Sequence, residues 1–551
     1  MLTTRAGSFV ILLCTVTSLS AQDESAAMFA RARENGRRFE QMVAAARRVM
    51  HAWLGQADTR TLLLPDRLPG ARGRKPGDTS RVYTPHNSGA DLYPYLILTA
   101  HLTDPDLYDG RMLDMLRNEI RFTTAQDAIP ANLDLDTGRR GPPSLFGAAE
   151  YAKDGLLAVT ELLGRTPWFY RMADMTVDLM KRAPVRSRFG NLPGSDTEVN
   201  GDVLQALVRL GPMTGDRRYL EWARRIGDAY FEEVLPGNHG LPSGNWDFEK
   251  HTGDGRLRLR DHGNETVVGL TLLYALEQYH ETARAARWRP QVARMLDRIL
   301  ESANPDGMLY NVIDASTLQP LDAGLSDNWG YVYGAVYAFY QVTGDTRYRD
   351  ATRRVLRNLP KYRNYDWERG SFDGYADSIE GALYLVAREP VPEALDWIES
   401  EIRVMAAMQK PSGLIEGWYG EGNFNRTALL YAYYKSQGCR PSHWAPELQL
   451  GAVRDRQKLY LNLEAPPGWN GRIRFDFARH RRSLNLSQNY VRLNEFPEWY
   501  TVEENLLYRI HSREEAEQVR LGSELIAGIP LAPGNWIIEP LAGQPHGLPA
   551  K

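Results

Sequence analysis

The sequence contains little cysteine: Cys14 and Cys439 are the only two in 551 residues. Cys14 lies in an N-terminal segment that is typical of a cleavable export signal, so the processed chain would keep a single cysteine. One cysteine can form no internal disulfide, no cysteine-based zinc site and no redox pair. The processed chain must therefore be stabilised by its core.

Long apolar runs and blocks of one charge are also missing. The net charge is −3, and Lys and Arg are spread along the chain, so no nucleic-acid-binding surface is expected. No apolar stretch reaches the ~20 residues that a membrane-spanning helix needs. Phosphate-loop, dinucleotide, His-Glu-x-x-His and Gly-x-Ser-x-Gly motifs are absent, and the sequence predicts no cofactor and no metal. A content of 43% hydrophobic and 25% charged residues is that of a globular protein.

Residues 1–21 have the features of a secretory signal. Arg5 is their only charge, an apolar core (FVILLCTV) follows, and Ser-Leu-Ser-Ala precedes Gln22 with small residues at the usual cleavage positions. The sequence therefore predicts a secreted or periplasmic protein.

What is abundant is a repeated pair of long helices. First helices, apolar on nearly all faces, begin near residues 89, 148, 200, 264, 327, 375 and 426, roughly 50–65 residues apart. Each of them except the last is followed by a charged, amphipathic helix, as in RRYLEWARRIGDAYFEE. Two pairs share the turn Thr-Gly-Asp-x-Arg-Tyr, in which Gly215 and Gly344 can end one helix and Asp216 and Asp345 can cap the next. An all-apolar helix is buried and an amphipathic one covers it.

These pairs predict a mainly α protein, an α/α toroid of six or seven helical hairpins, with an open solenoid as the alternative. Residues 24–54 would supply the outer helix that closes the ring. After residue 438 short alternating segments, at 458–463, 472–477, 489–492, 499–502, 506–511 and 535–540, predict a small antiparallel β domain. The expected organisation is a signal at 1–21, a toroid at 22–440 and a β domain at 445–545.

The loops that enter the apolar helices carry unusual polar clusters, and because these helices all run the same way, the clusters meet at one face of the ring. They include TPHNSGAD, GSDTEVNGD, RDHGNET, SDNWGY, SFDGYADSIE and IEGWYGEGNFNRT. Single residues such as Asp327, Asn264 and Asn425 fit helix N-caps, but caps do not explain the added His, Trp and Tyr. Aromatic residues make up 10% of the chain, and Trp or Tyr beside carboxylates is typical of sugar binding. Positive helix N-termini, with Arg260 or Arg426, could also hold a sugar carboxylate.

At these residues the chain resembles the six-hairpin glycosidase-like superfamily. The resemblance covers roughly residues 24–438 and rests on the hairpin rhythm, the Thr-Gly-Asp-x-Arg-Tyr turns and Asp327-Asn328-Trp329-Gly330-Tyr331. It implies an α/α toroid and a carbohydrate-active enzyme, since that group includes glycoside hydrolases, unsaturated glucuronyl hydrolases, epimerases and polysaccharide lyases. No single family is identified, and no catalytic residue is carried over from one.

Hydrolysis of a glycosidic bond needs a proton-donating acid and a second carboxylate. Asp327 is the first candidate because aromatics flank it, followed by Glu265, with His262 as neighbour, and Asp196. Candidate substrate-binding residues, all from the loop clusters, are His86, Asn87, Asp91, Glu198, Asn264, Trp329, Tyr331, Asp373, Tyr375, Asp377, Glu416, Trp418, Tyr419 and Arg426.

The prediction is a secreted glycoside hydrolase acting on an oligosaccharide or polysaccharide, with uronate-containing glycans among the candidates. A lyase would use a Tyr or His base on a uronate, and an epimerase would use similar groups. A non-catalytic glycan-binding protein is the remaining alternative. The sequence gives no indication of the sugar, its linkage or the oligomeric state.

Overall fold

The computed structural model describes residues 7–280, 282–512 and 515–541, with side chains from residue 23 onward except those of residues 261 and 262. The chain forms two compact units. One contains Ala45–Leu430 and Arg479–Pro497, and the other contains the remaining N-terminal residues, Tyr431–Ala478 and the C-terminal segment from Glu498. The expected boundaries at residues 22–440 and 445–545 differ from this division in three places. Residues 22–44 and 431–440 belong with the β strands, and residues 479–497 belong with the helices.

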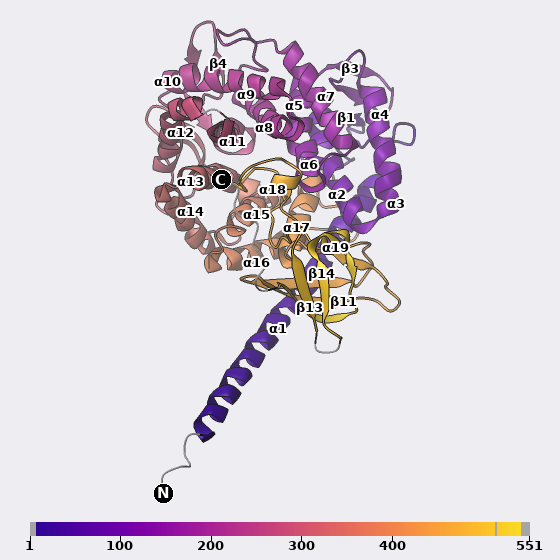
Figure 1. Cartoon of the computed structure of the whole chain (residues 1–551). Coiled ribbons are helices and arrows are strands. Elements are labelled where there is room, and N and C mark those ends of the chain that lie inside the picture. The colour runs from indigo at the N-terminus through magenta and orange to yellow at the C-terminus, as the bar shows by residue number, and fades with distance from the viewer. Residues whose placement is uncertain (1–6, 281, 513–514, 542–551) are drawn as a thin grey trace. The chain divides into compact units, whose positions relative to one another are not determined.

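The larger unit is a ring of helix pairs (Figure 1). Its inner helices in the described part of the chain are seven: α2 (Tyr93–Thr103), the continuous α5–η3–α6 (Leu145–Glu150, Tyr151–Leu156, Leu157–Leu163), α8 (Thr197–Thr214), α11 (Glu265–His280), α13 (Trp329–Thr343), α15 (Phe372–Val386) and α17 (Glu421–Lys435). The outer ones are α1 (Gly7–Leu54, through its C-terminal part), α4 (Leu113–Thr123), α7 (Pro167–Arg182), α9 (Arg217–Ala229), α12 (Thr282–Glu301), α14 (Thr346–Asn358) and α16 (Pro392–Ala407). The predicted α/α toroid is confirmed, with seven hairpins.

Ring closure joins segments far apart in the sequence. The Asn425 amide on α17 donates to Thr99 Oγ1 on α2 at 2.9 Å and to the carbonyl of Ala46 on α1 at 3.0 Å. Trp53 Nε1 on α1 donates to a Glu421 carboxylate oxygen at 2.8 Å. The C-terminal part of α1 is therefore the missing outer helix, as the sequence predicts.

The two repeated turns have the expected geometry. Gly215 and Gly344 have φ of 73° and 74°, a left-handed conformation that glycine adopts without strain. Asp216 accepts from the backbone N–H of Arg218, and Asp345 accepts from that of Arg347. These contacts end each inner helix and begin the outer helix that follows it.

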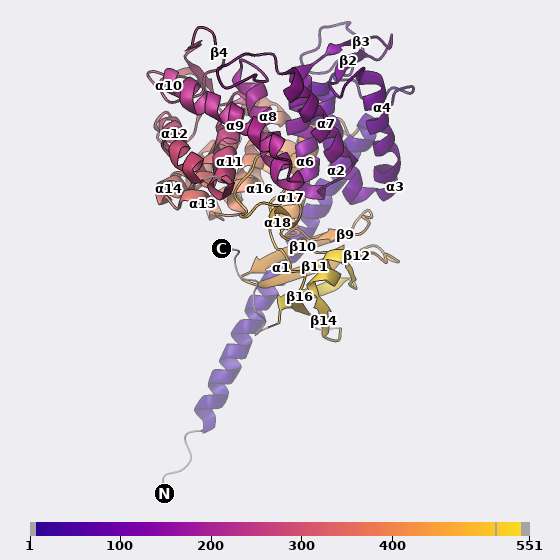
Figure 2. The same ribbon diagram turned by 45° about the horizontal axis from the view of Figure 1, so that its top comes forward.

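Small sheets extend from the ring, mostly in the loops that precede inner helices (Figure 2). They are β1–β2–β3 (Val82–Tyr83, Ala131–Asp134, Arg140–Pro143), β4–β5 (Trp246–Asp247, Thr252–Gly253) and β6–β7–β8 (Arg256–Arg258, Tyr310–Asp314, Pro320–Leu325), all antiparallel. They lengthen one end of the ring, the end at which the predicted polar clusters lie.

The smaller unit has a five-stranded antiparallel sheet in the order β10–β11–β16–β13–β14. Its strands are β10 (Gln449–Asp455), β11 (Lys458–Glu464), β16 (Gly534–Pro540), β13 (Leu507–His511) and β14 (Gln518–Leu521). A second sheet joins β9 (Arg440–Pro441), β12 (Arg472–Arg474) and β15 (Ile529–Pro530), and α19 (Gly522–Ala527) follows β14. The expected strand at 489–492 is absent because those residues belong to the helical unit, and residues 499–502 form only one isolated bridge, between Asp476 and Thr501.

Only part of the expected export signal at residues 1–21 lies within the described residues. Residues 1–6 of the expected signal lie outside the described residues, and residues 7–21 belong to α1. Among the described residues, no helix has the length and apolar character needed to cross a bilayer. Cys439 is buried and forms no disulfide with any of the described residues.

Candidate functional site

A cavity of about 240 Å³ lies in the helical ring. Most of its lining comes from the first turns of inner helices or from the loops just before them, where the sequence places its polar clusters. The lining residues are Asp91, Lys153, Asp154, Glu265, Asn328, Tyr331, Glu368, Asp373, Asp377, Trp418, Tyr419, Asn423, Arg426, Leu493 and Asn494.

The start of α15 supplies two of these carboxylates. Ser371 is the N-cap, and its Oγ accepts the backbone N–H of Asp373 at 3.4 Å. Because a serine fills the capping position, the side chains of Asp373 and Asp377 are available to the cavity. They lie four residues apart and therefore share one face of the helix.

These two carboxylates have different surroundings. Asp377 pairs with Arg426 Nη2 and accepts the Asn328 amide at 2.8 Å. Asp373 accepts the Asn423 amide at 2.9 Å. Burial, together with the negative charges of Asp377 and Glu368, raises the pKa of Asp373 well above its usual range. The cavity therefore holds one carboxyl whose pKa is raised and, beside it, one that is paired with Arg426.

Beneath Arg426 lies a fully buried carboxyl. Glu380 Oε2 lies 2.7 Å from Arg426 Nη2 and accepts the Tyr331 hydroxyl at 2.5 Å. Burial raises the pKa of Glu380 to about 7, although the Arg426 charge opposes this shift. Arg426 is thus held between Asp377 and Glu380, and its positive charge is already compensated before any ligand binds.

A buried lysine organises another side of the cavity. Lys153 Nζ lies 2.5 Å from an Asp154 oxygen and 2.6 Å from Glu265 Oε1. Glu265 Oε2 in turn accepts the Gln205 amide at 2.5 Å. Burial opposes a charge on Lys153, but the Asp154 and Glu265 carboxylates outweigh it and raise the pKa of its ammonium well above the usual value. Lys153 therefore forms a buried ion pair with each of the two carboxylates.

Of the residues expected at the site, the structure brings eight together in this lining: Asp91, Glu265, Tyr331, Asp373, Asp377, Trp418, Tyr419 and Arg426. The expected site residues outside the lining are Asp327, Asp196, His86, Asn87, Glu198, Asn264, Trp329, Tyr375 and Glu416. The side chain of His262 is not among those described.

Several of the residues outside the lining have structural roles. Asp196 is the N-cap of α8 and accepts the backbone N–H of Val199 at 2.8 Å. Trp329 is completely buried, and its Nε1 donates to Ser378 Oγ at 2.7 Å. Asp327, the first catalytic candidate, is buried, and its Oδ1 accepts the N–H of Asn328 at 3.0 Å.

Others hold neighbouring loops or reach the lining through another residue. The Asn87 amide donates to Asp66 at 2.9 Å, and Glu416 accepts the Trp418 Nε1–H at 2.8 Å. Asn264 contacts the lining residue Asn328 at 3.4 Å. Membership of a polar loop cluster is therefore not sufficient for a side chain to line the cavity.

Sequence reasoning missed Lys153, Asp154, Glu368, Leu493 and Asn494, and it placed Asn328 and Asn423 in the polar clusters without naming them as site residues. The Lys153-Asp154 pair within the apolar run AAEYAKDGLLAV was a usable signal, because charges on a buried helix need partners. Glu368 comes from the turn Trp367–Gly370, where Glu368 and Arg369 have φ of 45° and 59°. Leu493 and Asn494 lie outside the repeats altogether.

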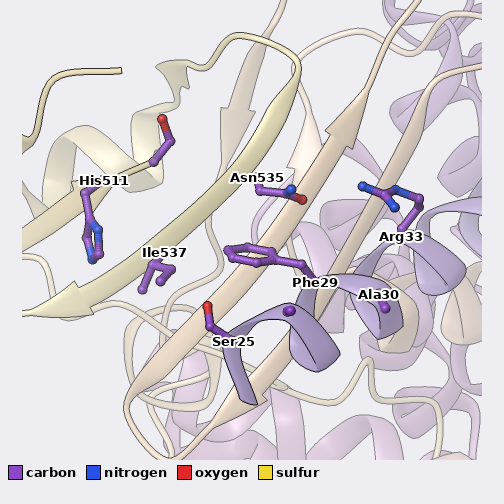
Figure 3. A pocket seen from close by; sticks show the side chains of 9 residues that line it. Ser25, Phe29, Ala30, Arg33, His511, Asn535 and Ile537 are labelled. Atoms are coloured by element: carbon purple, nitrogen blue, oxygen red, sulfur yellow. The ribbon is translucent and has the colours of Figure 1, made fainter. Parts of the chain in front are cut away.

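A second cavity, of about 450 Å³, lies in the smaller unit between the N-terminal part of α1 and strands β13 and β16 (Figure 3). Phe29 and Arg33 from α1 face it, as do His511, Asn535 and Ile537 from the strands. Its described lining contains no carboxylate. Among the residues that the structure describes, no three His, Cys, Asp or Glu side chains are grouped to hold a metal ion.

Comparison with known proteins gives structural matches only. No family model and no curated protein sequence matches the chain. A D-mannose isomerase structure has a TM-score of 0.42 and 13% identity over 57% of this chain and 84% of its own. An α-1,6-mannanase of Salegentibacter sp. HEL1_6 in complex with α-1,6-mannotriose has a TM-score of 0.40 and 14% identity over 57% and 95%. A family 76 glycoside hydrolase from a bovine Bacteroides thetaiotaomicron strain has a TM-score of 0.40 and 12% identity over 72% and 78%.

Proposed function

We propose that this chain is an exported glycoside hydrolase that removes a terminal sugar from an oligosaccharide or polysaccharide. The observation that carries the proposal is the contrast between Asp373 and Asp154, which line one cavity. The pKa of Asp373 is raised well above its usual range by burial and by Asp377, whereas Asp154 contacts the Lys153 ammonium at 2.5 Å. Carboxyl groups in opposite protonation states are what glycosidic bond hydrolysis requires.

In this mechanism Asp373 is the general acid. Its proton passes to the glycosidic oxygen as the bond to the anomeric carbon breaks, so the leaving sugar departs as an alcohol. Asp154 comes from η3, on the other side of the ring from α15, and its side chain is 11% exposed. Its carboxylate either attacks the anomeric carbon or removes a proton from the attacking water. The anomer formed first, observed by NMR, distinguishes these two routes.

The rest of the lining suits a sugar ring. Trp418 and Tyr419 present aromatic surfaces, and Trp418 is positioned by its hydrogen bond to Glu416. Asn328, Asn423 and Asn494 add amides that can bond to hydroxyl groups. A cavity of about 240 Å³ matches one sugar unit better than a long chain, which favours attack at a chain end.

The charge of the lining favours hydrolysis of a neutral sugar over elimination from a uronate. Six carboxyl groups line the cavity but only two cations, Lys153 and Arg426. Both cations already pair with carboxylates, so neither is available to neutralise a substrate carboxylate, as a lyase would need. An anionic sugar would also meet repulsion from the remaining carboxylates.

The test is a product assay on neutral and uronate-containing oligosaccharides, with release of reducing sugar and absorbance near 235 nm recorded together. We expect a terminal monosaccharide from a neutral substrate and no rise in absorbance. Asp373→Asn and Asp154→Asn should each lower kcat at least 100-fold with an unchanged circular dichroism spectrum. Asp114→Asn, which removes an exposed carboxylate on α4, is the matched control and should have full activity.

A rise in absorbance with uronate substrates would show that the enzyme is a lyase and not a hydrolase. Full activity of Asp373→Asn would remove Asp373 from the mechanism. Export is tested separately, by N-terminal sequencing of protein collected outside the cytoplasm, which we expect to begin at Gln22.

A further inference from the structure

Residues Arg479–Pro497, here called the return segment, belong to the helical unit although they come after the first strands of the smaller unit. The segment begins with the short helix α18 (Arg479–Arg482). Every side chain from Tyr490 to Phe496 is buried, with no more than 3% of its surface exposed. A connecting loop is normally exposed, so this degree of burial needs an explanation.

The return segment is bonded to the C-terminal parts of inner helices. Arg209 on α8 donates to the carbonyl of Leu493 at 3.1 Å, and Gln341 on α13 accepts the N–H of Val491 at 2.9 Å. The cavity, by contrast, is lined mainly from the N-terminal ends of these helices. In Figure 2, α18 accordingly lies at the opposite end of the ring from β2, β3 and β4.

A buried ionic network fixes the position of this segment. Arg492 Nε lies 3.0 Å from Glu161 Oε1 on α6, and Arg209 Nε lies 3.1 Å from the same oxygen. Arg492 also contacts Glu495 at 3.2 Å, and Arg388 donates to Glu495 at 2.8 Å. Buried charges are tolerated only when each is paired, so a shifted segment would leave several of them unpaired. The network therefore favours one placement of the segment.

Two residues of the return segment, Leu493 and Asn494, line the cavity itself. The Asn494 amide donates to the carbonyl of Lys153 at 2.7 Å, and Lys153 is the residue whose ammonium contacts Asp154. Asn494 has φ of 64°, in the left-handed region that asparagine tolerates better than most residues. The segment thus places an apolar and an amide side chain beside the proposed catalytic carboxylate.

We propose that the return segment is the floor of the cavity and that Leu493 and Asn494 are specificity-determining residues. These residues close the ring at this end and so limit the depth of the cavity. The cavity therefore accepts a terminal sugar only if the hydroxyl groups that face the floor carry no substituent. This inference rests on the proposed function, because it names how that site selects chain ends. The closed end excludes any substrate that would have to pass through the ring.

The experiment compares Leu493→Ala and Asn494→Gly with the wild type. Glycine adopts the left-handed conformation freely, so Asn494→Gly removes the side chain without backbone strain. Asn485→Gly is the matched control, because Asn485 also belongs to the return segment, has φ of 54° and donates to a ring carbonyl, that of Pro212 at 3.0 Å. Asn485 does not line this cavity.

The substrates are the p-nitrophenyl hexopyranoside that the wild type hydrolyses best and its mono-O-methyl derivatives at each sugar hydroxyl. The measured quantity is the kcat/KM of each derivative relative to that of the parent. One methyl group is worth a factor of ten or more in a close-fitting pocket. We expect Leu493→Ala or Asn494→Gly to raise this ratio at least tenfold for one derivative, and Asn485→Gly to leave all ratios unchanged.

If both variants fold and their kcat/KM ratios stay within twofold of wild type, the return segment does not determine specificity. The proposed hydrolase activity would not be affected by that result. If the wild type hydrolyses no glycoside, the proposed function is wrong. The floor is then tested by measuring the Kd of methyl hexopyranosides and their methylated derivatives by calorimetry. A tenfold change in relative Kd for one methylated derivative would then still support the floor. Unchanged relative Kd values, or no binding at all, would overturn it.

Discussion

Asp373 and Asp377 lie four residues apart on α15 and line the same cavity, but their polar partners differ. Asp377 contacts the Arg426 guanidinium, whereas Asp373 accepts a neutral amide, that of Asn423, at 2.9 Å. Burial and the negative charge of Asp377 raise the pKa of Asp373 well above its usual range. This asymmetry is the basis for proposing Asp373 as the proton donor.

The pH dependence of activity should report this asymmetry. If protonated Asp373 is the general acid, kcat/KM falls as the pH rises through its elevated pKa. Asp377→Asn removes a negative charge that raises this pKa, so the alkaline limb of the pH profile should move to lower pH. Asp114→Asn should leave the limb in place. A limb that moves to higher pH in Asp377→Asn would contradict the assignment.

The buried Lys153 should be essential for stability. Lys153→Met leaves Asp154 and Glu265 without the cation that both contact, and removing one partner of a buried ion pair costs about 3–5 kcal/mol. Lys181→Met is the matched control, because Lys181 pairs with Asp178 while 61% exposed, and such pairs contribute at most about 1 kcal/mol. Urea unfolding of both variants measures the difference. Equal urea midpoints for the two variants would show that the Lys153 ion pairs stabilise the fold no more than an exposed ion pair does.

Much of the fold could be predicted from the sequence because local rules decide it. The Thr-Gly-Asp-x-Arg-Tyr turns fix helix ends through Gly215 and Asp216, and all-apolar segments such as VYGAVYAFYQV must be buried. Ring closure was predictable as well, since one inner helix lacked an outer neighbour. The return segment was not, because residues 489–492 alternate like a strand, while the contacts that place them, such as Arg492 with Glu161, join distant parts of the chain.

The site could be predicted only as a region. Loop clusters located the end of the ring that carries most of the cavity lining, but they did not show which side chains line the cavity. Asp327 and Trp329 belong to the same cluster as the lining residues Asn328 and Tyr331. Helical rotation separates them: Trp329 turns into the core, while Tyr331 reaches the cavity. Lys153 and Asp154 were overlooked because they lie within a helix and not in the loop before it.

The pKa of Glu380, about 7, predicts a change of stability with pH. Burial raises this pKa above the value in the unfolded chain, so the folded state binds the proton more tightly. The resulting stabilisation is fully present below about pH 4.5, the unfolded value, and is lost as the pH rises through about 7. In Glu380→Gln the decline in melting temperature between pH 5 and pH 8 should therefore be smaller than in wild type. An identical decline in both proteins would assign it to other groups.

The close approach of inner helices explains why they need small residues, and it gives the last prediction. Gly330 on α13 and Gly381 on α15 face each other, and a Cβ added at either one would overlap the Cα of the other. Gly330→Ala should therefore force the two helices apart and lower the free energy of unfolding by about 1–3 kcal/mol, as other overpacked cores do. Gly110 has nothing within 4 Å of such an atom and a helical backbone, so Gly110→Ala should be neutral or stabilise by up to about 1 kcal/mol. Thermal unfolding of the pair separates packing from helix propensity, because alanine improves propensity at both positions. A stabilised Gly330→Ala variant would show that the two helices can move apart at no cost.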